Sequence, residues 1–137
     1  MENQVGKTKD VGFQFGLRKT IPVSTEKVWD FLFSEEGLNI WLGKLNAELE
    51  LKKEFETQNG IRGLVRVFNT NSHIRLNWKL KTWKNMSTVQ VRIIGNKTKT
   101  TIAIHQEKLL NSEQRNEMKE YWTQTISTLT NYINGNT

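Results

Sequence analysis

The last part of the chain, from Ser112 to about Ile133, has the pattern of one long amphipathic helix. Apolar residues recur there at steps of three and four, which places them along one side of a helix. They are Met118, Trp122, Ile126 (or Thr125), Leu129 and Ile133. Ser112 is suited to cap the start of this helix. A helix with one apolar stripe needs a partner surface, and we expect a sheet to supply it.

Most segments before this helix alternate between apolar and polar residues, which is typical of half-buried strands. The alternating runs centre on residues 13–21, 48–52, 64–68, 74–81, 89–93 and 101–105. Turn signals separate several of them: Asn59-Gly60, residues 70–72, and Gly95-Asn96-Lys97. Two short helices, about residues 25–33 and 35–42, follow cap candidates Ser24 or Thr25 and Ser34.

This order predicts an α+β protein: a curved antiparallel β-sheet of about six or seven strands, two short helices, and a long C-terminal helix packed on the sheet. A chain of 137 residues is long enough for one domain with a real core. We expect residues 1–12 to form a flexible N-terminus and residues 13–137 to form a single domain. The sequence has no long apolar run, no signal-peptide pattern and no cysteine, which favours a soluble cytoplasmic protein.

The net charge of +6 is unevenly distributed. Residues 57–108 carry 10 Lys and Arg against 1 Asp or Glu, whereas residues 1–56 carry 8 against 10. Alternation places four of these cations on the sheet face away from the final helix: Arg66, Arg75, Lys79 and Arg92. Such a face can attract an anionic partner, although a solvated basic surface accounts for the same pattern.

No catalytic or metal-binding set is visible in the sequence. His73 and His105 lack a second histidine or a carboxylate at ligand spacing, so we expect no metal site. No Ser or Thr is accompanied by the pattern of a nucleophile and its base, and no phosphate-binding glycine loop is present. We therefore expect no cofactor and no enzymatic activity.

Several segments, in their order and spacing, resemble START-like (SRPBCC, Bet v 1-like) proteins. The opening from Ile21 to Leu32 resembles the strand and Val-Trp helix of that superfamily. The tripeptide Trp41-Leu42-Gly43 resembles the branch related to the C-terminal domain of the activator of Hsp90 ATPase. The segments Gly63–Val65 and Arg75–Trp78, and the final helix with Tyr121-Trp122, match further family strands and the family's last helix.

The resemblance implies a helix-grip fold, often with an apolar cavity between the sheet and the last helix. Gln106 stands where the family often has histidine, and Tyr121 where glycine is common. Apolar pockets with a few polar groups bind small molecules. The residues predicted to line such a cavity are Trp41, Val67, Trp78, Val91, Ile104, Gln106, Met118, Tyr121, Trp122 and Thr125. For any single aromatic residue among them, core packing is favoured over contact with a ligand.

Two functional hypotheses follow. The first is non-enzymatic binding of a hydrophobic or amphipathic small molecule, lipid-like or aromatic, between the sheet and the C-terminal helix. The alternative is a chaperone-associated, Hsp90-activator-like module of the stress response. It would engage its partner through the helix surface or through the basic face of Arg66, Arg75, Lys79 and Arg92. Nucleic-acid binding is disfavoured because the aromatic residues alternate to the opposite face. Some START-like relatives are enzymes, but no residue set supports that role here.

Overall fold

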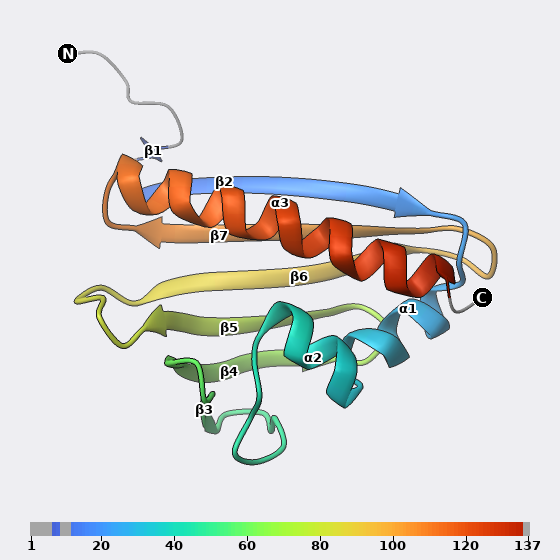
Figure 1. Ribbon diagram of the computed structural model, residues 1–137, viewed down its shortest axis with the longest axis horizontal. Coiled ribbons are helices and arrows are strands. Elements are labelled where there is room, and N and C mark those ends of the chain that lie inside the picture. The colour runs from blue at the N-terminus through green and yellow to red at the C-terminus, as the bar shows by residue number, and fades with distance from the viewer. Residues whose placement is uncertain (1–6, 9–11, 136–137) are drawn as a thin grey trace.

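The computed structural model describes residues 7–8 and 12–135, which form one antiparallel sheet covered on one face by helices (Figure 1). The strands are β1 (Lys7–Thr8), β2 (Gly12–Ile21), β3 (Glu54–Glu56), β4 (Ile61–Asn69), β5 (His73–Leu80), β6 (Ser87–Gly95) and β7 (Thr100–Leu109). The helices are α1 (Thr25–Leu32), α2 (Glu35–Trp41) and α3 (Ser112–Gly135). The predicted α+β architecture is confirmed. The predicted flexible terminus, residues 1–12, falls mostly outside the described residues.

The sheet has the strand order β1-β2-β7-β6-β5-β4-β3. The first long strand therefore pairs with the last one, while β4 to β7 follow one another as a meander. The predicted turns join them: Gly60 adopts a φ of 90° in the β3–β4 hairpin, and Asn71 adopts a φ of 62° between β4 and β5. The Asn96 side chain accepts backbone hydrogen bonds from Thr98 and Lys99 between β6 and β7.

The short helices begin where their caps were predicted. The hydroxyl of Ser24 accepts from the Lys27 N–H at 3.3 Å, and that of Ser34 accepts from the Gly37 N–H at 3.0 Å. The cap of α3 differs from the prediction. Asn111, rather than Ser112, accepts the Gln114 N–H at 2.8 Å, so Asn111 is the cap and Ser112 is the first residue of the helix.

The predicted strand around Leu49 and Leu51 does not form. Lys52 has a φ of 66° and the Lys53 N–H bonds back to the Glu50 carbonyl, so the chain turns there. Only Glu54–Glu56 pairs with β4 as a strand. Leu51 is consequently half exposed, with 50% of its surface accessible.

A β-bulge in β4 changes which side chains face the helices. Val65 lies opposite Leu76, but Val67 lies opposite Arg75, so one extra residue of β4 is accommodated between them. The alternation therefore reverses after Val65. Phe68 turns inward against Trp29 and Phe33, and Val67 turns to the outer face, contrary to its predicted place in the interior.

The core lies between the inner face of the sheet and the three helices. All five tryptophans are buried in it, and the predicted stripe of α3 is buried from Met118 to Ile133. None of the helices in residues 12–135 lies over the outer face of the sheet (Figure 1). Within the described part of the chain, no helix is both long and apolar enough to cross a membrane.

Candidate ligand site between the sheet and the last helix

Four aromatic rings form a continuous cluster at one end of the core. Trp83, from the loop between β5 and β6, meets Trp78 of β5 edge to face, with ring centroids 5.3 Å apart. Trp78 lies 6.5 Å from Tyr121 of α3, which meets Trp122 at 5.0 Å. Trp78 faces inward because Ile74, Leu76 and Trp78 alternate along β5. We call these four residues the aromatic cluster.

A chain of hydrogen bonds runs through the buried side of this cluster. The indole N–H of Trp122 donates to Gln106 Oε1 at 2.8 Å, and Gln106 Nε2 donates to the Ser87 hydroxyl at 3.0 Å. The Ser87 hydroxyl in turn donates to the backbone carbonyl of Trp78 at 2.5 Å. Gln106 and Ser87 are both 0% exposed, so each needs these partners to offset the loss of water.

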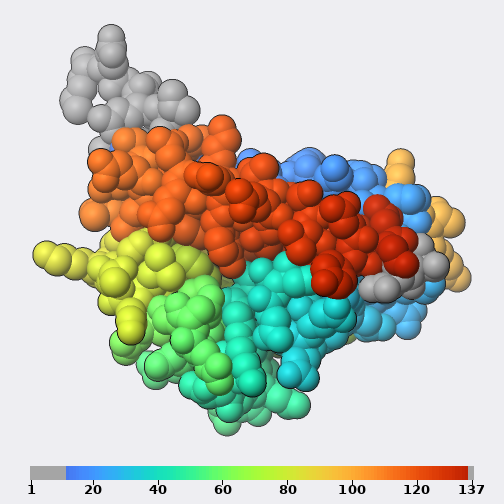
Figure 2. All heavy atoms as spheres, in the orientation of Figure 1, coloured from blue at the N-terminus to red at the C-terminus, as the bar shows by residue number. Residues whose placement is uncertain are grey.

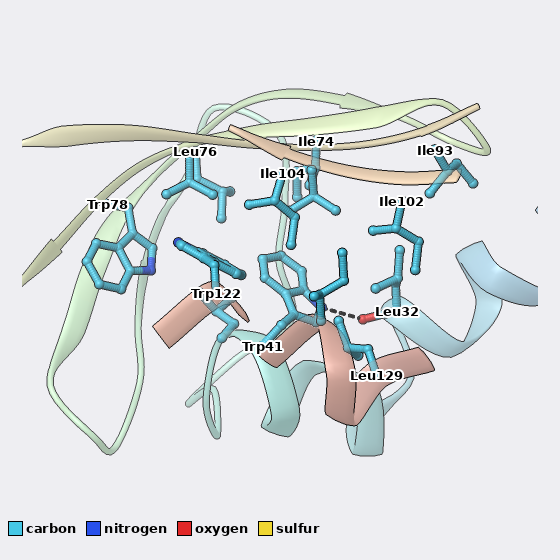
Figure 3. Close-up of a cluster of buried hydrophobic side chains, with 14 of the residues drawn as sticks. Leu32, Trp41, Ile74, Leu76, Trp78, Ile93, Ile102, Ile104, Trp122 and Leu129 are labelled. Atoms are coloured by element: carbon cyan, nitrogen blue, oxygen red, sulfur yellow. Dashed lines mark hydrogen bonds between the residues drawn. The ribbon is translucent and has the colours of Figure 1, made fainter. Parts of the chain in front are cut away.

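Trp78 itself retains an unpaired polar atom. Its Nε1 is the one buried side-chain nitrogen or oxygen in the described part of the chain that has no hydrogen-bond partner. Figure 3 shows this nitrogen on the side of the ring that faces Trp122. Leaving a buried donor unpaired costs about 1–3 kcal/mol, so the position is unfavourable as it stands.

The other two large donors of the region are satisfied by backbone carbonyls. Trp41 Nε1 donates to the Leu32 carbonyl at 2.8 Å, as the dashed line in Figure 3 marks. The Tyr121 hydroxyl donates to the Trp41 carbonyl at 2.9 Å, which ties α3 to α2. Burial raises the pKa of Tyr121 to about 12, and a hydrogen bond with Thr125 opposes this effect more weakly. The phenol is therefore neutral at physiological pH.

The structure places nine of the ten predicted cavity residues on the inner side. Trp78, Gln106, Tyr121 and Trp122 come together at the aromatic cluster, and Trp41 joins them through Tyr121. Val91, Ile104, Met118 and Thr125 are buried as well, with 2 to 7% of their surfaces exposed. Val67 is the exception, for the reason given above.

Two further participants, Ser87 and Trp83, were missed by the sequence analysis. Ser87 could have been found, since it precedes Val89, Val91 and Ile93 at the same two-residue step. Trp83 lies in the irregular loop of residues 81–86, where no periodicity predicts the direction of a side chain.

Side chains fill the space between α3 and the sheet in this conformation. Trp41, Trp78 and Trp122 are each at most 1% exposed. Hollows of about 430 and 390 Å³ lie elsewhere, around residues 43–56, and neither is lined by a residue of α3. In the space-filling view the segment around residues 80–90 lies directly against the N-terminal half of α3 (Figure 2).

The four predicted outer-face cations share the uncovered side of the sheet. In the described residues the only ion pair joins Lys53 and Glu50, so none of Arg66, Arg75, Lys79 and Arg92 has a carboxylate partner. Arg66 and Arg75 border a shallow hollow of about 200 Å³ that also contains Val67, Thr88, Glu107 and Lys108. Partial burial lowers the pKa of His73, and the neighbouring Arg92 and Arg75 lower it further.

Neither histidine has a metal-site environment in the described part of the structure. His73 Nδ1 lies 2.9 Å from the Ser72 hydroxyl, and His105 Nε2 lies 2.8 Å from Gln14 Oε1. Three or more potential metal-ligating side chains do not gather anywhere among these residues.

This arrangement, a long helix held against a curved antiparallel sheet, is the helix-grip fold of START-like (SRPBCC, Bet v 1-like) proteins. Residues 22–134 match the family described as Activator of Hsp90 ATPase homolog 1-like protein, and the chain belongs to that family. A comparison with curated protein sequences gave no match.

Solved structures with the same fold include DynU16 from the dynemicin biosynthetic locus, with a TM-score of 0.79 and 14% identity. The match covers 88% of this chain but only 47% of DynU16. CalU16 from Micromonospora echinospora has a TM-score of 0.79 at 16% identity, with 89% and 74% of the two chains covered. An Hsp90 activator from Plasmodium falciparum has a TM-score of 0.74 at 19% identity, with 89% and 96% covered. At these identities the likeness establishes the fold alone.

Proposed function

We propose that the protein binds a hydrophobic or amphipathic small molecule between the sheet and α3, without catalysing a reaction. The observation that carries this proposal is the unpaired Nε1 of Trp78, a buried donor inside an aromatic cluster. A bound acceptor would satisfy this donor, and the surrounding rings would bury apolar surface of the ligand.

Binding requires side chains to move, because the side chains of Trp41, Trp78 and Trp122 fill the interior. We infer that the part that moves is the loop of residues 81–86, because it contributes one ring to the cluster and lies between the strands β5 and β6. Trp83 covers Trp78 from this loop and is held by one backbone bond, from its N–H to the Leu80 carbonyl at 2.9 Å. Irregular loops open at lower free energy than the strands that they join.

Thermal denaturation and tryptophan fluorescence, measured against a panel of lipid-like and aromatic compounds, test the proposal. We expect at least one compound to raise the unfolding midpoint and to change the emission in a saturable way. The variant Trp29→Phe is a matched control that should keep this response, because the ring contacts of Trp29 are with Phe33 and Phe68. A panel without any saturable response would contradict small-molecule binding.

A second candidate function is docking of a chaperone of the Hsp90 class onto the outer face of the sheet. The observation in its favour is the group of four cations that lack counter-ions, Arg66, Arg75, Lys79 and Arg92. Unpaired cations on an open face attract an acidic partner surface and accelerate its association. Family membership makes an Hsp90 the first partner to test.

The test compares two variants that change the net charge equally. The variant Arg66→Glu/Arg75→Glu/Arg92→Glu reverses the outer face, and Lys27→Glu/Lys97→Glu/Lys119→Glu reverses exposed lysines on α1, the β6–β7 turn and α3. We expect only the first to weaken binding to the Hsp90 of the same organism. Equal effects of both variants would exclude a specific site on this face. Salt-dependent binding of single-stranded oligonucleotides would point to nucleic acid instead.

A further inference from the structure

Among the buried side-chain polar atoms of the described residues, a single donor at the aromatic cluster has no hydrogen-bond partner. Gln106 is occupied at both ends, by the Trp122 N–H and by the Ser87 hydroxyl. The Ser87 hydroxyl donates to the Trp78 carbonyl, and the Tyr121 hydroxyl donates to the Trp41 carbonyl. The Trp78 N–H alone remains without a partner among the buried side-chain polar atoms of the described residues.

No charged side chain is buried in the described core, so none lies inside the site to receive a charged ligand. The buried polar side chains of the described core are Thr57, Ser87, Thr100, Gln106, Thr125 and Thr130, and all of them are uncharged. The Tyr121 phenol is neutral, and its hydroxyl is already bonded to the Trp41 carbonyl. A carboxylate or an ammonium group placed here would lose its water without gaining a counter-ion, which is strongly unfavourable.

We propose that the site takes a neutral, largely apolar ligand with one hydrogen-bond acceptor, such as a ketone or an ester, bound to the Trp78 indole N–H. The inference rests on the proposed small-molecule function and narrows it to one chemical class. A carboxylate buried beside Trp78 is disfavoured, because none of the buried side chains of the described core carries a charge. A pure hydrocarbon fits the rings but leaves the Trp78 N–H unpaired.

The same geometry indicates the route of entry. Trp83 stacks edge to face on Trp78 and is 8% exposed, while Lys81, Thr82, Lys84 and Met86 around it are exposed. The loop is fastened to the rest of the protein by Asn85. Its amide exchanges two 3.0 Å hydrogen bonds with the Gln114 side chain of α3 and reaches the Lys108 carbonyl at 3.2 Å. When the hydrogen bonds of Asn85 break, Trp83 can move away from Trp78, and this movement opens the end of the core.

Three ligands of similar size and shape test the ligand class: methyl naphthyl ketone, ethylnaphthalene and naphthoate. Binding is followed on the uniformly ¹⁵N-labelled full chain through the five tryptophan indole N–H signals. We expect the ketone to bind most tightly, by up to about tenfold over the hydrocarbon, which is the difference that one neutral hydrogen bond makes. The ketone should also move the Trp78 indole proton downfield, and the hydrocarbon should not.

The variants Trp78→Phe and Trp29→Phe form a matched pair for this measurement. Trp78→Phe removes the free N–H, so it should bring the ketone and the hydrocarbon to nearly equal affinity. Trp29→Phe changes a tryptophan whose ring contacts are with Phe33 and Phe68, outside the aromatic cluster, and should retain the preference. The dispersion of the remaining indole signals shows whether each variant is folded.

The failures of the two proposals are distinguishable. If none of the three compounds binds, the small-molecule function and its ligand class both fall. If naphthoate or ethylnaphthalene binds as tightly as the ketone, the chemical class is wrong and the small-molecule function stands. A bound ketone that leaves the Trp78 indole signal in place would overturn the role of Trp78.

Discussion

Single residues at this site are constrained by what lies immediately across the sheet from them. Gly63 pairs with Trp78, and a Cβ at position 63 would lie 1.7 Å from the Asn77 carbonyl oxygen and 3.0 Å from the Phe55 ring. Backbone cannot yield at that distance without a shift of the β4–β5 pair. The absence of a side chain at Gly63 therefore allows β4 to pack closely against β5, the strand that carries Trp78.

We expect Gly63→Ala to lower the free energy of unfolding by about 1–3 kcal/mol, the usual cost of overpacking. Urea denaturation measures this change. Gly135→Ala is the matched control, because no atom lies within 4 Å of a Cβ at that position and alanine favours the helix. A loss at Gly63 no larger than that at Gly135 would show that the two strands separate easily.

Gln106 is constrained by hydrogen bonding, since it pairs Trp122 with Ser87 in a dry environment. We expect Gln106→Leu to destabilise the protein by about 1–3 kcal/mol, because the Trp122 N–H loses its acceptor. In the double variant with Trp122→Phe, the donor is removed together with its acceptor. In a double-mutant cycle measured by urea denaturation, the loss of stability in the double variant should therefore be smaller than the sum of the losses in the two single variants. Strict additivity would contradict the coupling.

The buried phenol of Tyr121 should make the stability of the protein depend on pH. The pKa of its phenol is about 12 in the folded protein, against an ordinary value of 10.0. Because the pKa is raised in the folded state, the phenol of Tyr121 contributes to the free energy of unfolding. This contribution is fully present below pH 10 and is lost as the pH rises from about 10 to about 12. Denaturation midpoints followed across this range should fall more steeply for the native protein than for Tyr121→Phe. Parallel curves would mean that the phenol is accessible to water.

At the level of secondary-structure elements, periodicity located the helices and long strands and failed where one residue was inserted. The stripe of α3 and the alternation of β5 depend on repeated burial, which averages over many positions. The β4 bulge depends on a single extra residue, so it could not be read from alternation, and Val67 was misplaced. The position of Trp83 depends on tertiary contacts of an irregular loop, which leave no local pattern.

The start of α3 is another place where the structure differs from the prediction made from sequence, and the difference can be tested. Asn111 accepts the Gln114 N–H and thereby caps the helix, whereas the sequence alone favoured Ser112. We expect Asn111→Ala to cost about 0.5–2 kcal/mol of unfolding free energy and Ser112→Ala to cost much less. Chemical denaturation of the two variants decides between them. The reverse order would restore Ser112 as the cap.

For the molecule as a whole, the two faces of the sheet have opposite requirements. The inner face and helices bury the apolar residues, and the sequence predicted nearly all of that separation because it follows from alternation. The outer face gathers cations without counter-ions, so like charges repel one another there. The effect of this repulsion on the free energy of unfolding can be measured.

We expect the neutral variant Arg66→Gln/Arg75→Gln to be more stable than the native protein at low ionic strength, by at most about 1 kcal/mol. The gain should disappear near 1 M salt, where the screening length falls to about 3 Å. The control variant Lys27→Gln/Lys119→Gln changes the net charge equally, with one substitution on α1 and one on α3, and should gain less. If both variants respond alike, net charge rather than the outer face is responsible. A gain confined to Arg66 and Arg75 would mean that the native protein keeps these cations together at the expense of stability, as a surface reserved for an acidic partner requires.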